Sequence, residues 1–129
     1  MRNSMSKSDL KQKLSELAYE VTQNAATEPP FSGELYDCFD DGVYNCVCCD
    51  TVLFLSKDKF NSSTGWPSFH SCVNQEAIEQ ISDNSFGMAR TEVLCSNCKA
   101  HLGHVFDDGP KPSFKRFCIN SVALNFIKK

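Results

Sequence analysis

Two C-x-x-C pairs constrain the fold of this chain more than any other feature of its sequence. Cys46 and Cys49 form the first pair, and Cys95 and Cys98 form the second. Two residues between ligands allow a tight turn to present both thiolates to one ion, and two such turns complete a tetrahedral shell. Soft thiolates without a nearby imidazole or carboxylate favour zinc. The spacing predicts one structural Zn2+ per chain, with several strands threaded between the two turns.

Other roles for these cysteines stay open on the sequence alone. Cys48 offers an alternative C-x-C pair with Cys46, although a regular turn prefers Cys46 and Cys49. The four cysteines could instead be reduced thiols of the core or form two redox-active disulfides. The basic start, MRNSMSKSDL, lacks the apolar stretch of a secretory signal. We therefore expect a cytoplasmic protein, in a compartment where cysteines more often bind metals or carry out redox chemistry.

Composition and charge exclude several broad classes of function. Hydrophobic residues make up 41% of the 129 residues and charged residues 22%, which is typical of a soluble globular domain. No apolar run approaches the roughly 20 residues that span a bilayer. The net charge of -3 gives no electrostatic basis for binding nucleic acids or anionic membranes. We expect a monomer without either kind of partner.

The pattern along the chain predicts a helical N-terminus followed by an antiparallel β domain. Residues 1–8 are expected to form a disordered tail, and residues 9–129 a single domain. A short helix is predicted over 74–81. Helical spacing separates the apolar residues Leu10, Leu14, Leu17, Ala18 and Val21, which indicates an amphipathic helix packed on the core. Apolar runs bounded by turn residues predict strands at Val43–Cys46, Val52–Leu55, Phe86–Leu94, Leu102–Phe106 and Phe114–Phe126, the last overlong as a single strand.

Cys118 lies in the apolar segment RFCIN near the C-terminus. In a strand, Arg116, Cys118 and Asn120 share one face. A nearby cation lowers the pKa of a thiol, so these three residues form a candidate reactive site. A buried structural cysteine is the alternative interpretation of Cys118.

Two histidines follow the second C-x-x-C pair. Imidazoles exchange protons near neutral pH, so His101 and His104 are candidate proton donors for a thiol reaction. In a regular strand they would face opposite ways, but a bulge or bend at Gly103 would turn both toward one pocket. Trp66, beside a proline in GWPSF, is either a core aromatic or a rigid wall for a methyl or thioether group.

Taken together, these segments resemble the methionine-R-sulfoxide reductase B family over residues 19–126. The resemblance rests on VTQNAATEPPF (21–31), CVCC (46–49), GWPSF (65–69), CSNCKAHLGHVFDDGP (95–110) and RFCINS (116–121). It implies a mainly β fold of two antiparallel sheets with short N-terminal helices, related to Mss4-like, zinc-stabilised proteins. It also implies thiol-dependent reduction of the R epimer of methionine sulfoxide in oxidised peptides and proteins.

The same resemblance assigns roles to the candidate residues. Cys118 aligns with the nucleophile, which becomes a sulfenic acid during the reaction. Trp66 aligns with the wall for the substrate methyl group, and Arg116 is expected to help bind the substrate. The remaining assignments are the residues that bind or protonate the sulfoxide oxygen, His101, His104 and Asn120, and the zinc ligands Cys46, Cys49, Cys95 and Cys98.

The sequence departs from the family pattern at the resolving cysteine. Many members carry it two positions before the Trp of GWPSF, where this chain has Thr64. A second thiol must condense with the sulfenic acid to give a disulfide that thioredoxin can reduce. Cys38 is our first candidate, because some relatives use a cysteine in the loop before the first pair. Cys72, Cys48 and direct reduction by an external thiol are the alternatives.

Two functions of other classes also fit parts of the sequence. A zinc-ribbon interaction module would account for the cysteine pairs and the strands but not for Cys118, Asn120 and the two histidines. A zinc-dependent redox switch would release its metal when the thiols are oxidised. Turnover of a sulfoxide substrate separates the reductase from both.

Overall fold

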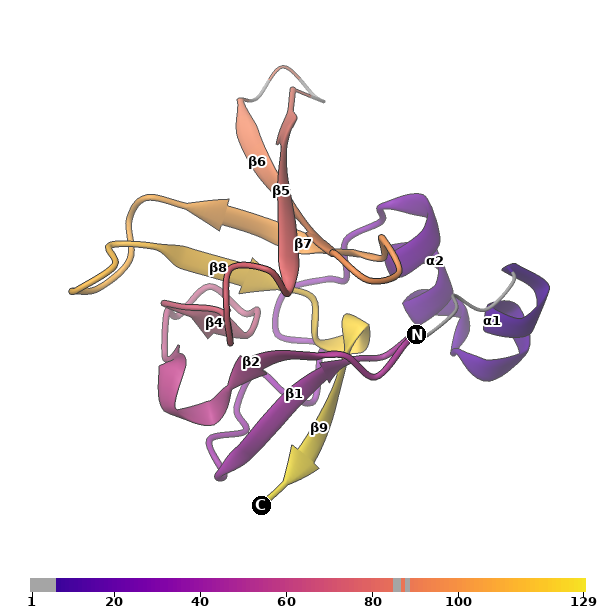
Figure 1. The fold of residues 1–129 in the computed structure, drawn as a ribbon, viewed down its shortest axis with the longest axis horizontal. Helices are drawn as coiled ribbons and strands as arrows, with labels where there is room; N and C mark the ends of the chain where they lie inside the picture. The colour runs from indigo at the N-terminus through magenta and orange to yellow at the C-terminus, as the bar shows by residue number, and fades with distance from the viewer. Residues whose placement is uncertain (1–6, 85–86, 88) are drawn as a thin grey trace.

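The computed structural model describes residues 7–84, 87 and 89–129 and is mainly β, with two antiparallel sheets and two short helices in that part of the chain (Figure 1). The predicted fold class is therefore confirmed. Residues 1–6 of the predicted tail lie outside the described residues, and the first helix begins at Lys7. No helix in the described ranges combines the length and apolar character needed to cross a membrane.

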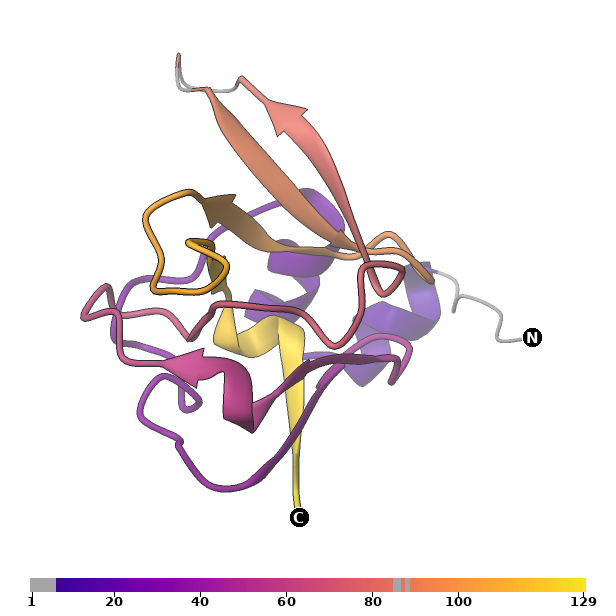
Figure 2. The ribbon, with the colours of Figure 1, turned by 60° about the vertical axis from the view of Figure 1, so that its left-hand side comes forward.

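The strands form one small and one large sheet. The small sheet has the order β2-β1-β9 and consists of Val52–Leu55, Gly42–Cys46 and Leu124–Lys128. The large sheet has the order β3-β4-β8-β7-β6-β5 and consists of Lys59–Phe60, Ser68–Phe69, Arg116–Ile119, His101–Phe106, Arg90–Cys95 and Ile78–Asp83. The β5–β6 hairpin projects from the rest of the molecule (Figures 1 and 2).

The N-terminal helix is divided in two. Helix α1 covers Lys7–Lys13 and α2 covers Glu16–Asn24, because Ser15 caps α2 by accepting a hydrogen bond from the backbone N of Ala18 at 3.1 Å. Helix α2 packs against β7 and the C-terminal part of the chain. The predicted apolar stripe is buried except at Leu17, which is 37% exposed.

One predicted element, a helix, was wrong, and the segment predicted to be too long for a single strand is indeed divided. The predicted helix over 74–81 is a single turn followed by β5, whose backbone pairs with β6 from Ile78 to Asp83. Pairing along this hairpin outweighs the weak helical preference of a short segment. The predicted strand Phe114–Phe126 is broken into β8, a 3-10 turn at Ser121–Ala123 and β9. Phe86 lies outside the described residues, and β6 begins at Arg90.

An aromatic core holds the two sheets together. Phe54 of the small sheet stacks on Phe69 of the large sheet with ring centroids 4.4 Å apart, and Tyr44 meets Phe69 edge-on at 5.0 Å. Phe117 of β8 lies 5.8 Å from Phe54. Each such pair contributes about 0.5–1.5 kcal/mol beyond the area it buries. Because Phe117 faces this core, Cys118, the next residue along β8, points to the opposite face of the sheet.

Candidate active site and metal site

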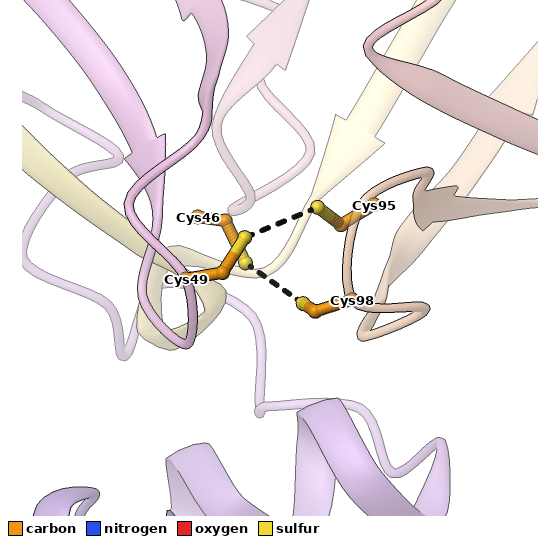
Figure 3. A group of neighbouring side chains, drawn as sticks. All are labelled: Cys46, Cys49, Cys95 and Cys98. Atoms are coloured by element: carbon orange, nitrogen blue, oxygen red, sulfur yellow. Dashed lines mark hydrogen bonds between the residues drawn. The ribbon is translucent and has the colours of Figure 1, made fainter. Parts of the chain in front are cut away.

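The four cysteines of the C-x-x-C pairs meet between the two sheets (Figure 3). Their sulfur atoms all lie within 4.8 Å of one another, and the Cys46–Cys98 and Cys49–Cys95 sulfur distances are both 3.6 Å. Tetrahedral coordination with metal–sulfur bonds of about 2.3 Å requires sulfurs about 3.8 Å apart. The donor set and its spacing therefore fit a tetrahedral metal ion.

The two turns that carry these cysteines have the same backbone hydrogen bond and the same backbone conformation. Asp50 N donates to Cys46 O at 2.8 Å, and Lys99 N donates to Cys95 O at 2.7 Å. Asp50 and Lys99 both have positive φ, 65° and 66°. Each turn thus folds back tightly enough to aim both of its thiols at the same point. Cys48 is not one of these four, but its thiol contacts those of Cys46 and Cys98 and lies 3.6 Å from the side-chain nitrogen of Gln23.

A pocket of about 260 Å3 opens on the face of the large sheet that carries Cys118. Register explains why its residues meet. His104 on β7 and Ser68 on β4 both pair directly with Cys118, so the three side chains lie in one row across neighbouring strands. The predicted site residues that line the pocket are Trp66, His104, Arg116, Cys118 and Asn120.

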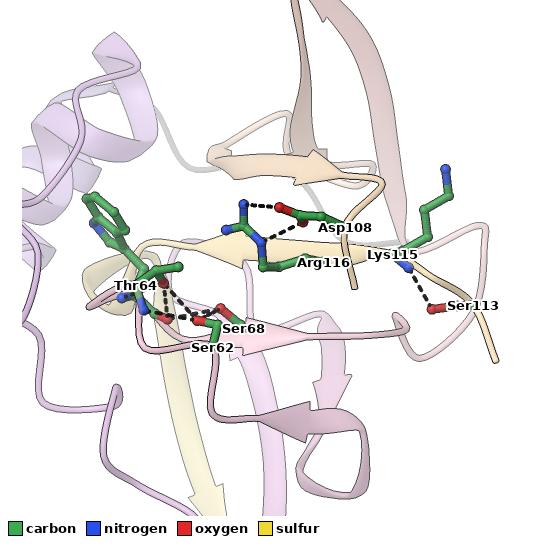
Figure 4. Close-up of polar contacts among 8 residues, drawn as sticks. Ser62, Thr64, Ser68, Asp108, Ser113, Lys115 and Arg116 are labelled. Atoms are coloured by element: carbon green, nitrogen blue, oxygen red, sulfur yellow. Dashed lines mark hydrogen bonds and ion pairs between the residues drawn. The ribbon is translucent and has the colours of Figure 1, made fainter. Parts of the chain in front are cut away.

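Cys118 is half-buried at the base of this pocket. Burial raises the pKa of its thiol, whereas the Arg116 guanidinium and a hydrogen bond with the Thr64 hydroxyl lower it. Arg116 is fixed by a two-point ion pair with Asp108, with N–O distances of 2.8 and 3.1 Å (Figure 4). Its guanidinium also lies 4.5 Å from the centre of the Phe106 ring. A fixed cation therefore stands beside the thiol.

A bulge in β7 brings the two histidines together. The pairing of β7 with β6 shifts between Gly103 and His101, so Leu102 is an extra residue without a partner on β6. The extra residue lets the side chains of His101 and His104 lie on the same face of the sheet. The imidazole rings of His101 and His104 are 5.5 Å apart as a result. The predicted bulge is thus present, next to Gly103. The carbonyl oxygen of Cys118 lies so close to Gly103 that a Cβ at residue 103 would be only 2.1 Å from it. A residue without a side chain is therefore required at this position.

Each histidine is oriented by a carboxylate. His101 Nδ1 lies 2.6 Å from Glu92, and His104 Nε2 lies 2.7 Å from Asp83. His101 is only 4% exposed, and burial lowers its pKa despite Glu92. Its Nε2 is buried without a hydrogen-bond partner among the described residues. His104 lines the pocket, whereas His101 is buried and does not line it.

Asn120 and Trp66 are both tied to Glu28. Asn120 Oδ1 accepts from Glu28 N at 2.9 Å, and the Trp66 indole donates to Glu28 O at 3.0 Å. The Asn120 amide also donates to Leu102 O at 2.9 Å. Glu28 is itself fully buried, and its carboxylate accepts from Val122 N. These contacts lock the segment around Glu28 over the pocket and fix the plane of the indole.

Comparison with known proteins decides the family. The family model described as "SelR domain" matches residues 14–128. Two curated proteins named "Peptide methionine sulfoxide reductase MsrB", from Escherichia coli O139:H28 and Escherichia coli K12, are each 52% identical over 126 residues, covering 98% of this chain and 92% of theirs. The chain belongs to the MsrB family.

In this MsrB chain the candidate resolving thiols lie outside the pocket. The Cys38 carbonyl accepts from Tyr44 and Lys59. Lys59 on β3 pairs directly with Phe69 on β4, so both side chains lie on the core face of the large sheet. Cys118 lies on the opposite face. Thr64, by contrast, touches the Cys118 thiol and belongs to a hydroxyl network with Ser62 and Ser68 (Figure 4).

The other two spare thiols are also distant from the pocket that this MsrB chain forms. Cys72 lines a different cavity together with Phe117, which faces the core side of β8. Cys48 is buried beside the four-cysteine group. None of the three thiols lines the pocket among the residues that the structure describes.

Sequence reasoning missed several residues of the MsrB site. Thr27 and Phe106 line the pocket, and Glu92 and Asp83 orient the histidines. Thr27 and Glu28 lie inside the TEPPF segment that marked the resemblance, so that motif could have pointed to them. Glu92 and Asp83 carried no signal of their own, because their roles depend on strand register.

Proposed function

We propose that this protein reduces the R epimer of methionine sulfoxide in peptides and proteins to methionine, with Cys118 as the nucleophile. Membership of the MsrB family supports the reaction. The single observation that carries the assignment of residues is the row in which Cys118 and His104 are direct cross-strand neighbours at the base of one pocket. An interaction module would not require a thiol, a cation and an imidazole to converge there.

The chemistry follows from these positions. The Cys118 thiolate attacks the electrophilic sulfur of the sulfoxide, and the sulfoxide oxygen gains charge as it takes up a proton. The attack forms a sulfur–sulfur bond between Cys118 and the substrate, and the sulfur–oxygen bond breaks as the twice-protonated oxygen leaves as water. Water then attacks the Cys118 sulfur and the sulfur–sulfur bond breaks with its electron pair going to methionine. Loss of a proton from the attacking water leaves Cys118 as a sulfenic acid. Cys118 is thereby oxidised by two electrons while the substrate sulfur is reduced by two. His104 lines the pocket and is the proposed proton donor, held by Asp83 and backed by His101.

Selectivity for the R epimer is assigned to Trp66 opposite the polar groups of the pocket. The indole is held by its hydrogen bond to Glu28 O, so its apolar face is available to the substrate methyl group. Exchanging methyl and oxygen would press the oxygen against the ring and the methyl against His104. Asn120 donates and accepts backbone hydrogen bonds, so its proposed role is to hold the pocket as well as to face the substrate oxygen.

Turnover of the separated epimers tests this function. A peptide containing either the R or the S sulfoxide is incubated with the protein and dithiothreitol, which reduces both a sulfenic acid and a disulfide. We expect methionine from the R epimer alone, measured by liquid chromatography. Conversion of neither epimer by folded protein would reject the reductase, and equal conversion of both would reject the role of Trp66.

We further propose that Cys38 resolves the sulfenic acid. The Cys38 thiol attacks the Cys118 sulfur, water leaves, and thioredoxin reduces the resulting disulfide by exchange. Cys38 lies in the segment 25–41, which has no helix or strand, and the segment is held to the sheet by Lys59. The disulfide therefore requires residues around Cys38 to leave Lys59 and move toward Thr64.

Peptide mapping after one turnover tests this pairing. Protein is mixed with one equivalent of R-sulfoxide peptide without reductant, alkylated and digested, and a Cys38–Cys118 linked peptide is expected by mass spectrometry. Cys38→Ser should lose thioredoxin-supported turnover but keep turnover with dithiothreitol. Adding Thr64→Cys should restore it, because residue 64 touches Cys118.

Cys72→Ser is the matched control for this pairing and should behave like the wild type. Cys118 recovered only as a sulfenic acid would contradict the Cys38 pairing and favour direct reduction.

The proposed metal is one structural Zn2+, held by Cys46, Cys49, Cys95 and Cys98. Four thiolates without nearby imidazole or carboxylate ligands favour zinc over harder ions. The ion would crosslink the two sheets and supply no step of the reaction. We also propose a cytoplasmic monomer. A cycle of free thiols needs a reducing compartment.

A further inference from the structure

Phe31 has an unusual backbone for a bulky residue. Its φ is 64°, in the left-handed region, and its side chain is 66% exposed. Bulky residues rarely adopt this conformation, because it crowds the side chain against the backbone. Backbone strain of this kind is concentrated at functional sites. An exposed aromatic ring on a strained backbone gains little from the folded state, which points to a role outside stability.

The position of Phe31 is set by the turn that forms one wall of the pocket. Phe31 N donates to Gly65 O at 2.8 Å, and a Cβ on Gly65 would lie 2.8 Å from the Phe31 ring. Gly65 stands between Thr64 and Trp66, both of which line the pocket. Phe31 therefore lies directly beside the pocket wall.

A second aromatic residue steadies the exposed ring. Tyr36 meets Phe31 edge-on, with ring centroids 5.2 Å apart. The Tyr36 hydroxyl in turn donates to Asn61 Oδ1 at 3.3 Å, which ties it to the segment before the turn. We call this pair, Phe31 and Tyr36, the aromatic platform. It is a preformed apolar surface next to Gly65, which stands between two residues that line the pocket.

We propose that the aromatic platform binds an apolar or aromatic side chain next to the methionine sulfoxide in the substrate polypeptide. This rests on the proposed function. An extended chain rises about 3.3 Å per residue, so neighbours of the reacting residue must pass over the pocket rim. An apolar side chain that reaches the platform gains from the burial of its apolar surface, whereas free methionine sulfoxide has no neighbouring side chain to place there. The platform would thus favour oxidised segments of unfolded proteins over free methionine sulfoxide.

Three R-sulfoxide substrates test the platform, with dithiothreitol as reductant: an acetylated pentapeptide with Phe on both sides of the sulfoxide, the same peptide with Ser, and free N-acetylmethionine sulfoxide. The main variant is Phe31→Gly, which removes the ring while glycine tolerates the φ of 64°. We expect kcat/KM for the Phe peptide to fall about three- to tenfold relative to the other two substrates, chiefly through KM. Phe31→Tyr should restore the wild-type ratio.

Phe39→Ala is the matched control. Phe39 is another exposed phenylalanine, 53% accessible, but its ring lies against the Lys59 ammonium group, 4.7 Å from the ring centre. It should keep the wild-type values for all three substrates. An equal loss on all three substrates with Phe31→Gly would overturn the proposal, since the ring would then only support the turn. An unchanged ratio would overturn it too. Wild-type protein inactive on every R-sulfoxide would instead overturn the proposed function itself.

Discussion

Cys118→Ser should lower the R-sulfoxide reductase activity by a factor of at least about 10⁴, with either dithiothreitol or thioredoxin as reductant. A serine hydroxyl is not ionised near neutral pH and cannot take up the substrate oxygen as a sulfenic acid, so the first step has no nucleophile. The change replaces a half-buried sulfur by a smaller oxygen at a site that already contains hydroxyl partners. The variant should therefore fold. Liquid chromatography of the released methionine measures the loss of activity, and a thermal melt tests whether the variant folds.

Cys72→Ser is the control for this loss. Cys72 is also a half-buried thiol, but it lies in a different cavity and should keep full turnover with dithiothreitol. Alkylation of the wild-type protein gives a second readout of the same thiol. Burial raises the pKa of Cys118, so inactivation by iodoacetamide should speed up as the solution becomes more alkaline. Activity in Cys118→Ser above about one per cent of the wild type would show that another group is the nucleophile.

Short-range patterns in the sequence were enough to predict the parts of the site that depend on local geometry. The two C-x-x-C turns need only a tight backbone, and the structure brings their four thiols together. The alternation Arg116, Cys118, Asn120 follows from strand period, and all three line one pocket. The bulge beside Gly103 was predicted from two histidines that had to share a face.

Contacts that depend on strand register could not be predicted in this way. Nothing near Glu92 in the sequence shows that its carboxylate contacts His101 on the neighbouring strand, or that the Asp83 carboxylate contacts His104. The β5 strand was mistaken for a helix because its pairing partner lies across a hairpin loop. Cys38 is the first candidate because some relatives use a cysteine in the same loop, and its contact with Lys59 is visible only in the fold. In each case a distant segment decides the outcome.

Cys95→Ser should prevent the protein from binding the proposed zinc ion and should leave most of the chain unfolded at about 25 °C. Structural zinc in zinc-finger peptides contributes about 10–16 kcal/mol of apparent binding free energy, which is as large as the whole stability of a typical domain, about 5–15 kcal/mol. Cys95 is fully buried, so its loss removes one of four ligands at a position where water cannot easily replace it. Elemental analysis and circular dichroism of the purified variant measure the two effects.

The matched control is Cys48→Ser, in the same turn as two of the ligands but outside the four-sulfur group. It should keep one zinc per chain and a cooperative melt. The large loss of stability expected for Cys95→Ser, compared with Cys48→Ser, follows from the positions of the four ligands. Cys46 ends a strand of the small sheet and Cys95 ends a strand of the large one, so the ion would join the two sheets whose contact aims Cys118 at the pocket. A metal-free Cys95→Ser that melts like the wild type would mean that the aromatic core alone holds the sheets.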